Sequence, residues 1–339
     1  MSVSVLIGTG IRLLGDFCIS RADFQKKIKE IKKRYKDKKI IEKYKNDTIY
    51  YIMSFHTETF GIATSIRAVL SNIKYALDNN WIPIVDMQST PNPYLNQDEV
   101  GKLNAWEFYF VQPLQASLND IKGKKNVIYA DQAQHEICPT DSMEFYSNQF
   151  SVDYWRKLYK KYIVLNKKTS EFICRQYEIL FGDSKVLGCI CRGTDYVERR
   201  AYKHPIQPKT EELINEAKVL IEKREYEKIF LATEDERILK EFKNAFGSKL
   251  IYVEQQRYND GKIPLALQDS FAKKTSRKEE GLKYVTAIYL LGKCNAIIGG
   301  RCGMSTISYL ISDGYEYTHL WNLGRYGIDD YCLPEEYLG

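Results

Sequence analysis

The stretch VLGCICRGTDY, residues 186–196, decides the fold of this chain. Its apolar beginning is typical of a strand buried on both faces. Gly193, which directly follows Arg192, allows a close turn at the end of this strand. An arginine is therefore predicted at the carboxyl end of a buried strand, with further strands and helices on both sides of it in the sequence.

Strands and helices alternate on the C-terminal side of this stretch. Apolar runs predict strands at 228–235, 249–254, 295–300 and 317–323. Helical periodicity predicts helices at 209–224, 236–245, 278–292 and 303–312. This alternation is typical of a mostly parallel sheet with helices on both faces.

A second strand–helix–strand series lies on the N-terminal side. It consists of predicted strands at 48–55, 81–87 and 126–131 and a helix at 62–77 that follows Gly61. Two further helices, at 152–164 and 167–181, connect the two series. The chain is therefore predicted to be α/β, with two Rossmann-like domains covering residues 1–165 and 166–339.

The positive charge of the chain is concentrated in one segment. The 339 residues include 50 basic and 44 acidic side chains, a net charge of +6, and residues 21–45 alone hold 12 basic and 4 acidic side chains. The remainder is slightly acidic, which argues against a broad nucleic-acid-binding surface. The segment is predicted to form a Lys-rich helix with an apolar stripe.

Several classes of protein do not fit the sequence. No apolar run approaches the length of a membrane span, and the N-terminus is a poor signal peptide. The eight cysteines include no C-x-x-C, and Cys189 and Cys191 favour core thiols over a metal site. The four histidines are widely separated and no D-x-D occurs, so no metal is expected. We expect a cytoplasmic protein.

The densest polar cluster follows the strand at 186–192. It contains Arg192, Asp195, Glu198 and His204. An arginine at the end of a strand can bind a phosphate bidentately, and Asp195 can orient it. The alternative is an ordinary turn with a surface ion pair.

Two other clusters also end predicted strands. Thr233, Glu234 and Asp235 can accept hydrogen bonds from a ribose or base, or can cap the next helix; taken alone, they favour the cap. The run GGRCGMST, residues 299–306, can bring backbone N–H groups to an anion, or its glycines can serve close packing. Gly61 begins a similar, weaker turn. Neither a Walker A loop nor a G-x-G-x-x-G fingerprint occurs, which argues against a dinucleotide-dependent oxidoreductase.

Together these motifs resemble the fucosyltransferase superfamily, which includes core α1,6-fucosyltransferases, nodulation fucosyltransferases and protein O-fucosyltransferases. The resemblance lies in GCICRGTDY (188–196), HPI (204–206), ATED (232–235) and the helix–strand–helix at 281–311. NPYLN (92–96) and NAWEF (104–108) are similar to bacterial surface-polysaccharide enzymes.

The resemblance implies a GT-B fold, in which two Rossmann-like domains with mostly parallel sheets face a cleft. The C-terminal domain would hold a nucleotide sugar and the N-terminal domain would lie on the acceptor side. It implies inverting transfer without a metal or cofactor, with Arg192 stabilising the leaving nucleoside diphosphate. The implied donor-binding residues are Gly61, Arg192, Asp195, His204, Thr233, Glu234, Asp235, Arg301, Gly303, Ser305 and Thr306.

The sequence departs from the family at the positions of the base and of the nucleobase. Arg200 aligns with a proposed base glutamate, and Ala287 aligns near a guanine-binding aspartate. Glu198 is the nearest candidate for the general base, and Glu58 and Asp86 are alternatives.

The expected function is transfer of fucose from GDP-fucose to a glycan acceptor in surface polysaccharide synthesis, such as a capsule. The alternatives are a transferase that uses another nucleotide sugar and a non-catalytic nucleotide- or sugar-binding member of the fold. If the acceptor is lipid-linked, residues 21–45 offer peripheral contact with an anionic membrane; the other interpretation of this segment is a solvated helix face.

Overall fold

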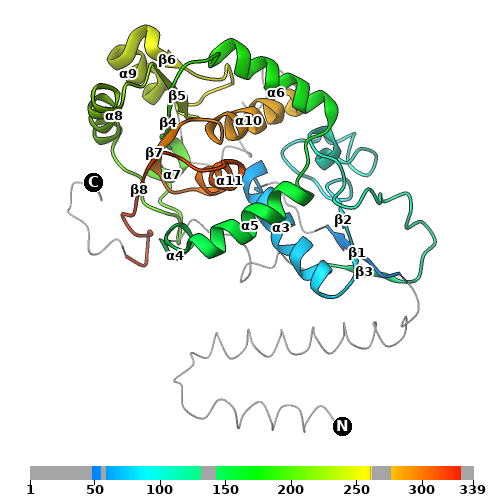
Figure 1. Cartoon of the computed structure of the whole chain (residues 1–339). Helices are drawn as coiled ribbons and strands as arrows, with labels where there is room; N and C mark the ends of the chain where they lie inside the picture. Colours follow the sequence, from blue (N-terminus) through cyan, green and yellow to red (C-terminus); the bar gives the residue numbers. More distant parts are fainter. Residues whose placement is uncertain (1–47, 55–58, 131–142, 260, 262–275, 330–339) are drawn as a thin grey trace, which may run out of the picture. The chain divides into compact units, whose positions relative to one another are not determined.

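The computed structural model describes residues 48–54, 59–130, 143–259, 261 and 276–329. The described residues from Tyr50 onward form one compact unit that contains two parallel sheets (Figure 1). The basic segment 21–45 lies outside the described residues.

The smaller sheet has the strand order β2-β1-β3, and all its pairs are parallel. Its strands are β1 Tyr50–Met53, β2 Ile82–Val85 and β3 Val127–Tyr129. After β1 the chain enters the long helix α3, Ile62–Asp78, and a short 3-10 helix, η1 Ala105–Phe108, lies between β2 and β3. The apolar positions of α3 are buried, so its amphipathic pattern directs the N-terminus of the helix to a fixed place in the fold.

The larger sheet has the strand order β6-β5-β4-β7-β8 and is parallel throughout. Its strands are β4 Val186–Ile190, β5 Lys228–Ala232, β6 Leu250–Ile251, β7 Ala296–Gly300 and β8 Tyr317–Trp321. The central position of β4 explains its apolar sequence, because both of its faces and both of its edges are covered.

Helices cover both faces of the larger sheet. They are α8 Thr210–Arg224, α9 Glu236–Phe246, α10 Arg277–Leu291 and α11 Gly303–Ile311. Figure 1 shows α8 and α9 on one face and α10 and α11 on the other. On the first face, Leu187, Cys189 and Cys191 pack with Leu213 of α8 and Phe242 of α9 in one buried cluster.

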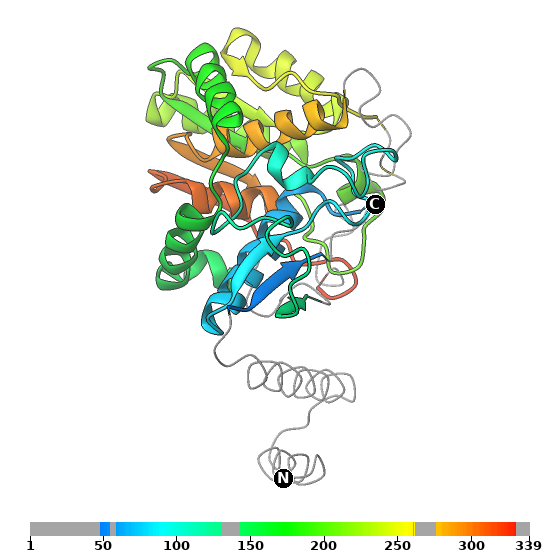
Figure 2. The same cartoon turned by 90° about the vertical axis from the view of Figure 1, so that its right-hand side faces the viewer.

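Three more helices connect the two sheets, and a short one follows β4. The connecting helices are α4 Met143–Ser147, α5 Gln149–Tyr162 and α6 Lys167–Leu180, and the short one is α7 Thr194–Glu198. Helices α3, α5 and α11 contact one another and lie side by side in both views (Figures 1 and 2). The N-terminus of α3 is thereby brought next to that of α11.

The predicted elements from residue 48 onward are confirmed, with ends that differ by three residues or fewer. The predicted boundary at 165/166 separates the two sheets, but its status as a domain boundary stays a prediction. Within the described residues, none of the helices combines the length and the apolar character that crossing a bilayer requires.

Candidate functional site

Arg192 lies directly after β4, between two carboxylates. Its side chain is 13% exposed; Nη2 lies 3.0 Å from Asp195 Oδ1 and Nη1 lies 3.2 Å from Glu234 Oε2. Burial lowers the pKa of Arg192, but the two carboxylates raise it to above its ordinary value. Among the described residues, no group accepts a hydrogen bond from the buried Nε. Arg192 is therefore a permanent, oriented cation at the end of the central strand.

The turn after Arg192 is held by the residues that follow β5. Glu234 accepts hydrogen bonds from the Gly193 amide (2.9 Å) and the Thr194 hydroxyl (3.0 Å), and Asp235 accepts one from the Thr194 amide (3.2 Å). A Cβ on Gly193 would lie 2.4 Å from Asp235 Oδ2, so this close approach requires glycine. Burial raises the pKa of Glu234, and the charge of Arg192 opposes that rise. These carboxylates fix the turn from within the protein.

Asp235 also begins helix α9. Its side chain accepts the Arg237 amide proton at 2.8 Å and pairs with the Arg237 guanidinium at 2.6 Å. This is the helix-capping role that the sequence favoured for Thr233, Glu234 and Asp235. Asp235 lines neither of the two cavities described below.

Glu198 is held away from the cleft. Oε1 accepts a hydrogen bond from Arg237 Nη2 at 2.7 Å, and Oε2 accepts one from the Gly261 amide at 2.9 Å. The general-base role expected of Glu198 stays a prediction, and these contacts argue for a structural role instead. Asp86 likewise accepts the Gln88 and Ser89 amide protons in a turn after β2. Glu58 lies outside the described residues.

The guanidinium of Arg192 also contacts an aromatic ring, which in turn contacts a second ring. The guanidinium carbon lies 4.6 Å from the centroid of the Tyr196 ring, and that ring lies 5.1 Å from the His204 ring, centroid to centroid. Cation, phenol and imidazole thus form one series of contacts, called the aromatic stack below, in which the two rings are tilted by 51° to each other. The stack is exposed at its His204 end.

These residues border a cleft of about 190 Å³. Gly303 closely approaches α3, because a Cβ at this position would lie 3.3 Å from Ala63 Cβ. The first turns of α3 and α11 therefore meet at the cleft with their positive dipole ends, and the leading amides of each helix have no acceptor within that helix. The cleft is lined by Thr59, Gly61, Ile62, Ala63, Thr64, Pro93, Tyr94, Arg192, Asp195, Tyr196, His204, Tyr284, Ile288, Cys302, Gly303 and Met304.

The glycines at the end of β7 serve close packing. A Cβ on Gly299 would lie 2.1 Å from the Ile190 carbonyl oxygen, and one on Gly300 would lie 1.8 Å from Gln207 Oε1. The packing interpretation thus holds for these two glycines, while Gly303 lines the cleft.

The polar side chains around Gly303 point elsewhere. Arg301 donates to the Leu320 carbonyl of β8 and lies over the Tyr146 ring. Ser305 Oγ and Thr306 Oγ1 each lie 3.0 Å from the Tyr146 hydroxyl. None of these three side chains lines the cleft, so their expected contact with a donor stays a prediction.

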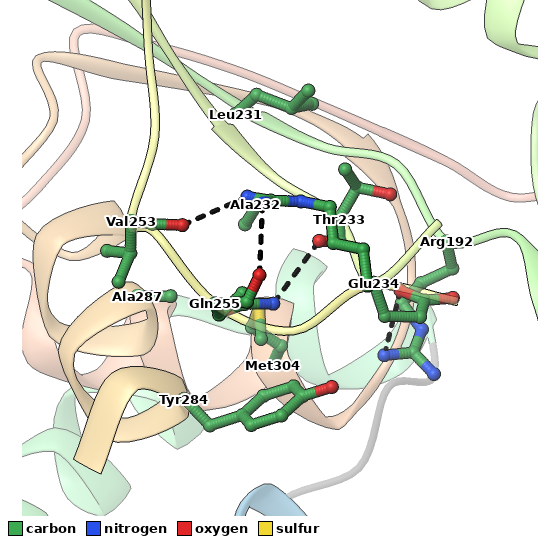
Figure 3. A pocket seen from close by; sticks show the side chains of 11 residues that line it. Arg192, Leu231, Ala232, Thr233, Glu234, Val253, Gln255, Tyr284, Ala287 and Met304 are labelled. Carbon is green, nitrogen blue, oxygen red and sulfur yellow. Dashed lines mark hydrogen bonds and ion pairs between the residues drawn. The ribbon is translucent and has the colours of Figure 1, made fainter. Parts of the chain in front are cut away.

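A narrow cavity of about 10 Å³ adjoins the cleft. Arg192, Tyr284 and Met304 line both spaces. Figure 3 shows the Gln255 carboxamide beside the end of β5 and the Tyr284 hydroxyl on the side of Arg192. The cavity is lined by Arg192, Leu231, Ala232, Thr233, Glu234, Val253, Gln255, Arg257, Tyr284, Ala287 and Met304.

Gln255 leaves one polar atom of this cavity unpaired. Its Nε2 donates to the Thr233 carbonyl at 3.3 Å, whereas the buried Oε1 accepts nothing from the described residues. An unpaired buried acceptor costs free energy, which a ligand N–H group would recover. Sequence reasoning missed Gln255, because a glutamine in a loop after a short strand gives no signal of its own.

Of the predicted site residues, the structure brings Gly61, Arg192, Asp195, His204 and Gly303 to the cleft. It brings Thr233 and Glu234 to the narrow cavity. The remaining lining residues were missed, although the glycine turn before α3 was a signal for its first-turn amides.

The described cysteines are free, and Cys189, Cys191, Cys294 and Cys302 are buried. Burial raises the pKa of the Cys191 thiol to about 12. The described residues contain no group of three or more His, Cys, Asp or Glu side chains placed to hold a metal ion. The core-thiol interpretation of Cys189 and Cys191 is therefore confirmed.

Comparisons with known proteins concern the fold. No known family pattern matches the sequence, and no curated protein matches it. The structure is similar to a NodZ α1,6-fucosyltransferase co-crystallised with GDP, with a TM-score of 0.50 and 14% identity over 78% of this chain and 93% of that chain. It is similar to the fucosyltransferase NodZ from Bradyrhizobium, with a TM-score of 0.50 and 13% identity over 78% and 94%. POFUT1 in complex with GDP-fucose matches with a TM-score of 0.48 and 8% identity over 82% and 99%.

The chain thus has the two-sheet α/β fold of the NodZ fucosyltransferases, which confirms the predicted GT-B fold class and, at the level of the fold, the resemblance to fucosyltransferases.

Proposed function

We propose that this protein is an inverting, metal-independent glycosyltransferase that transfers fucose from GDP-fucose to a glycan acceptor. One observation carries the proposal: Arg192 and the first turns of α3 and α11 border the same cleft. A diphosphate needs several donors and positive charge at one place, and this arrangement supplies both.

The first turns of the two helices replace a metal in this proposal. The positive ends of α3 and α11 lie next to each other, so they repel until an anion lies between them. The amides of residues 62–64 and 303–304 would donate to the diphosphate oxygens, while Arg192 binds the β-phosphate. An enzyme built in this way keeps its activity in the presence of a chelator.

The nucleoside would extend towards the narrow cavity, and entry of its base would require the side chains of Tyr284 and Met304 to move. Gln255 Oε1 would accept an N–H proton from the base, such as guanine N1–H. The GDP form of the donor is proposed because a similar fold was crystallised with GDP. A donor with another nucleobase is the alternative, since Ala287 provides no carboxylate for guanine.

In the proposed reaction, Arg192 acts on the leaving group. An acceptor oxygen attacks the anomeric carbon from the face opposite the diphosphate, so the configuration inverts. The bond between that carbon and the β-phosphate oxygen breaks, and its electron pair leaves with the nucleoside diphosphate. Because negative charge grows on this oxygen in the transition state, the fixed cation of Arg192 accelerates the step.

The test uses Arg192→Ala and Arg192→Lys with GDP-fucose as substrate. We expect Arg192→Ala to abolish GDP release and to weaken GDP binding about 10- to 100-fold. Arg192→Lys keeps the charge but loses the fork of donors, so turnover falls while the fold is retained. Arg175→Ala is the control, because Arg175 is an exposed arginine of α6 that lines neither cavity. Turnover near that of the wild type in Arg192→Ala would refute the assignment.

A panel of ligands separates the alternatives. Calorimetry with GDP, UDP, dTDP and NAD identifies the nucleobase, and binding of NAD alone would overturn the proposal. A protein that binds GDP-fucose but never cleaves it is the non-catalytic alternative.

We also propose a role in surface polysaccharide synthesis, in which residues 21–45 bind the anionic cytoplasmic face of a membrane that carries a lipid-linked acceptor. Each basic residue near such a surface contributes about 1 kcal/mol. Liposomes that contain anionic lipid should retain the protein at low salt. Equal retention after neutralisation of Lys26, Lys29, Lys33 and Lys36 would exclude this segment as the anchor.

A further inference from the structure

His204 lies at the opposite end of the aromatic stack from the cation that binds the leaving group. Both His204 and Arg192 line the cleft, and the Tyr196 ring separates them. Arg192 is mostly buried, whereas His204 is exposed. One end of the stack therefore faces the protein interior and the other end is exposed at the cleft.

The backbone holds His204 in this position. Its amide donates to the Ala201 carbonyl at 2.9 Å, and its carbonyl accepts the Tyr326 amide proton at 3.0 Å. On either side, Lys203 donates to the Tyr326 carbonyl and Ile206 donates to the Gly324 carbonyl. Three successive contacts with residues 324–326 fix the segment, so the imidazole is carried by ordered backbone.

The carboxylates near the cleft are already committed to other contacts. Asp195 pairs with Arg192, and Glu198 is held by Arg237 and the Gly261 amide. Among the described residues that line the cleft, His204 is the one whose type titrates near neutral pH. A general base is most effective when its pKa lies near the working pH.

Tyr196 separates the imidazole from the guanidinium, and an inverting displacement needs such a separation between base and leaving group. The contacts of 4.6 Å and 5.1 Å along the stack place the imidazole one aromatic ring beyond the guanidinium. In inverting glycosidases, the group that assists departure and the base lie about 6.5–9.5 Å apart, because the attacking oxygen needs room. A sugar ring alongside Tyr196 would have its leaving oxygen near Arg192 and its open face towards His204.

We propose that His204 is the general base of the transfer, an inference that rests on the proposed function. The neutral imidazole takes the proton of the acceptor hydroxyl as that oxygen bonds to the anomeric carbon. The carbon–oxygen bond to the diphosphate breaks, and its electron pair leaves with the nucleoside diphosphate at Arg192. The imidazolium then releases its proton to solvent. Water can replace the acceptor hydroxyl, and the products are then free sugar and GDP.

Charged groups from several elements surround His204. Arg192 and Asp195 line the same cleft, Lys203 precedes it in sequence, and Arg325 with Asp329 follows the segment that pairs with it. We expect GDP release to increase with pH through a single transition between about pH 5 and 8, as neutral imidazole forms.

The test compares His204→Gln with His319→Gln, the same change at a histidine of β8 that stacks on Trp321. GDP release from GDP-fucose, with water as the acceptor, should fall about 100-fold or more in His204→Gln and lose its pH transition. GDP affinity should stay within about twofold of wild type. Added imidazole should restore part of the GDP release of His204→Ala. His319→Gln should behave as the wild type does.

Two outcomes would overturn the base assignment alone. Undiminished GDP release in His204→Gln shows that another group takes the proton. Loss of GDP affinity together with turnover shows a donor-binding residue, the role expected from the sequence. If the wild-type protein releases no GDP from GDP-fucose and none of the nucleotide sugars tested is cleaved, the proposed function fails as well.

Discussion

Gly299 lies where β7 passes closest to the central strand β4. Its φ of +142° is a conformation that L side chains rarely adopt, and a Cβ there would lie 2.1 Å from the Ile190 carbonyl oxygen. Gly314 has the same φ of +142° but lies in open space, with no atom within 4 Å of an added Cβ. Substitution of Gly314 therefore tests backbone strain alone, whereas substitution of Gly299 tests strain together with a steric clash.

We expect Gly314→Ala to lower the free energy of unfolding by about 1–2 kcal/mol, because only strain is introduced. Gly299→Ala adds a clash with backbone inside the sheet, so the loss should be about 3 kcal/mol or more. Urea unfolding of both variants measures the difference. An equal loss of unfolding free energy in both variants would mean that the backbone at Ile190 moves to accept the new Cβ without a measurable free-energy penalty.

Single side chains are the least predictable part of the site. The sequence placed Arg192 correctly, because a cation directly after a buried strand has to emerge at the end of the sheet. The direction of Arg301 could not be predicted, because it depends on the Leu320 carbonyl of a strand nineteen residues later. The pairing of Glu198 with Arg237 depends likewise on helix α9, which begins far along the chain from Glu198.

At the scale of the element, helix α9 begins at a charged cap. Burial raises the pKa of Asp235. Hydrogen bonds from the Arg237 side chain and from the Thr194 and Arg237 amides lower it by a larger amount, so the pKa lies below its ordinary value. A lowered pKa in the folded state stabilises the protein above the unfolded-state value of about 3.9. This contribution is lost as the pH falls through the folded-state pKa.

Asp235→Asn keeps an effective capping side chain and removes the charge. We expect the free energy of unfolding to fall by about 1–2 kcal/mol at pH 6. The difference from wild type should shrink as the pH falls below about 3.9 and through the lowered pKa at which Asp235 becomes protonated in the wild type. Urea titrations at pH 6 and pH 3 check this, with the exposed Asp183→Asn as a control. A difference that is independent of pH would exclude the charge as its cause.

The elements themselves were well predicted, for a physical reason. Strands β4 and β7 are continuous apolar runs because parallel strands are buried on both faces, and such runs are visible without a partner. The short helix α7 was missed because its five residues follow a turn that depends on two carboxylates located just after β5. Local patterns predict elements, whereas contacts across the sheet determine such turns.

At the scale of the whole molecule, several hydrogen bonds connect the residues before α6 with those after it. The Tyr109 hydroxyl donates to the Lys278 carbonyl, Tyr159 donates to the Tyr289 hydroxyl, and Arg156 donates to the Tyr309 carbonyl. The cleft lies between α3 from the first part and α11 from the second, so a ligand bound there requires both.

GDP should therefore stabilise the protein as a whole. At a concentration 100 times its Kd, GDP adds about 2.7 kcal/mol to the free energy of unfolding, which raises Tm by several degrees. Because no metal takes part in the proposed site, the same shift is expected with EDTA present. Thermal unfolding with GDP, with and without EDTA, provides the measurement. A shift that disappears with EDTA would contradict metal-independent binding.

The amides of the turn after Arg192 face inward, and this affects how fast the backbone amides of the site exchange their hydrogen with solvent. The Gly193 and Thr194 protons are already bound to Glu234 and Asp235, so in D₂O they should exchange slowly whether or not a nucleotide is present. The amides in the first turn of α3 have no such acceptor within their helix and should slow only on binding. Deuterium uptake thus divides the site into a part that is ordered before any ligand arrives and a part that the ligand completes.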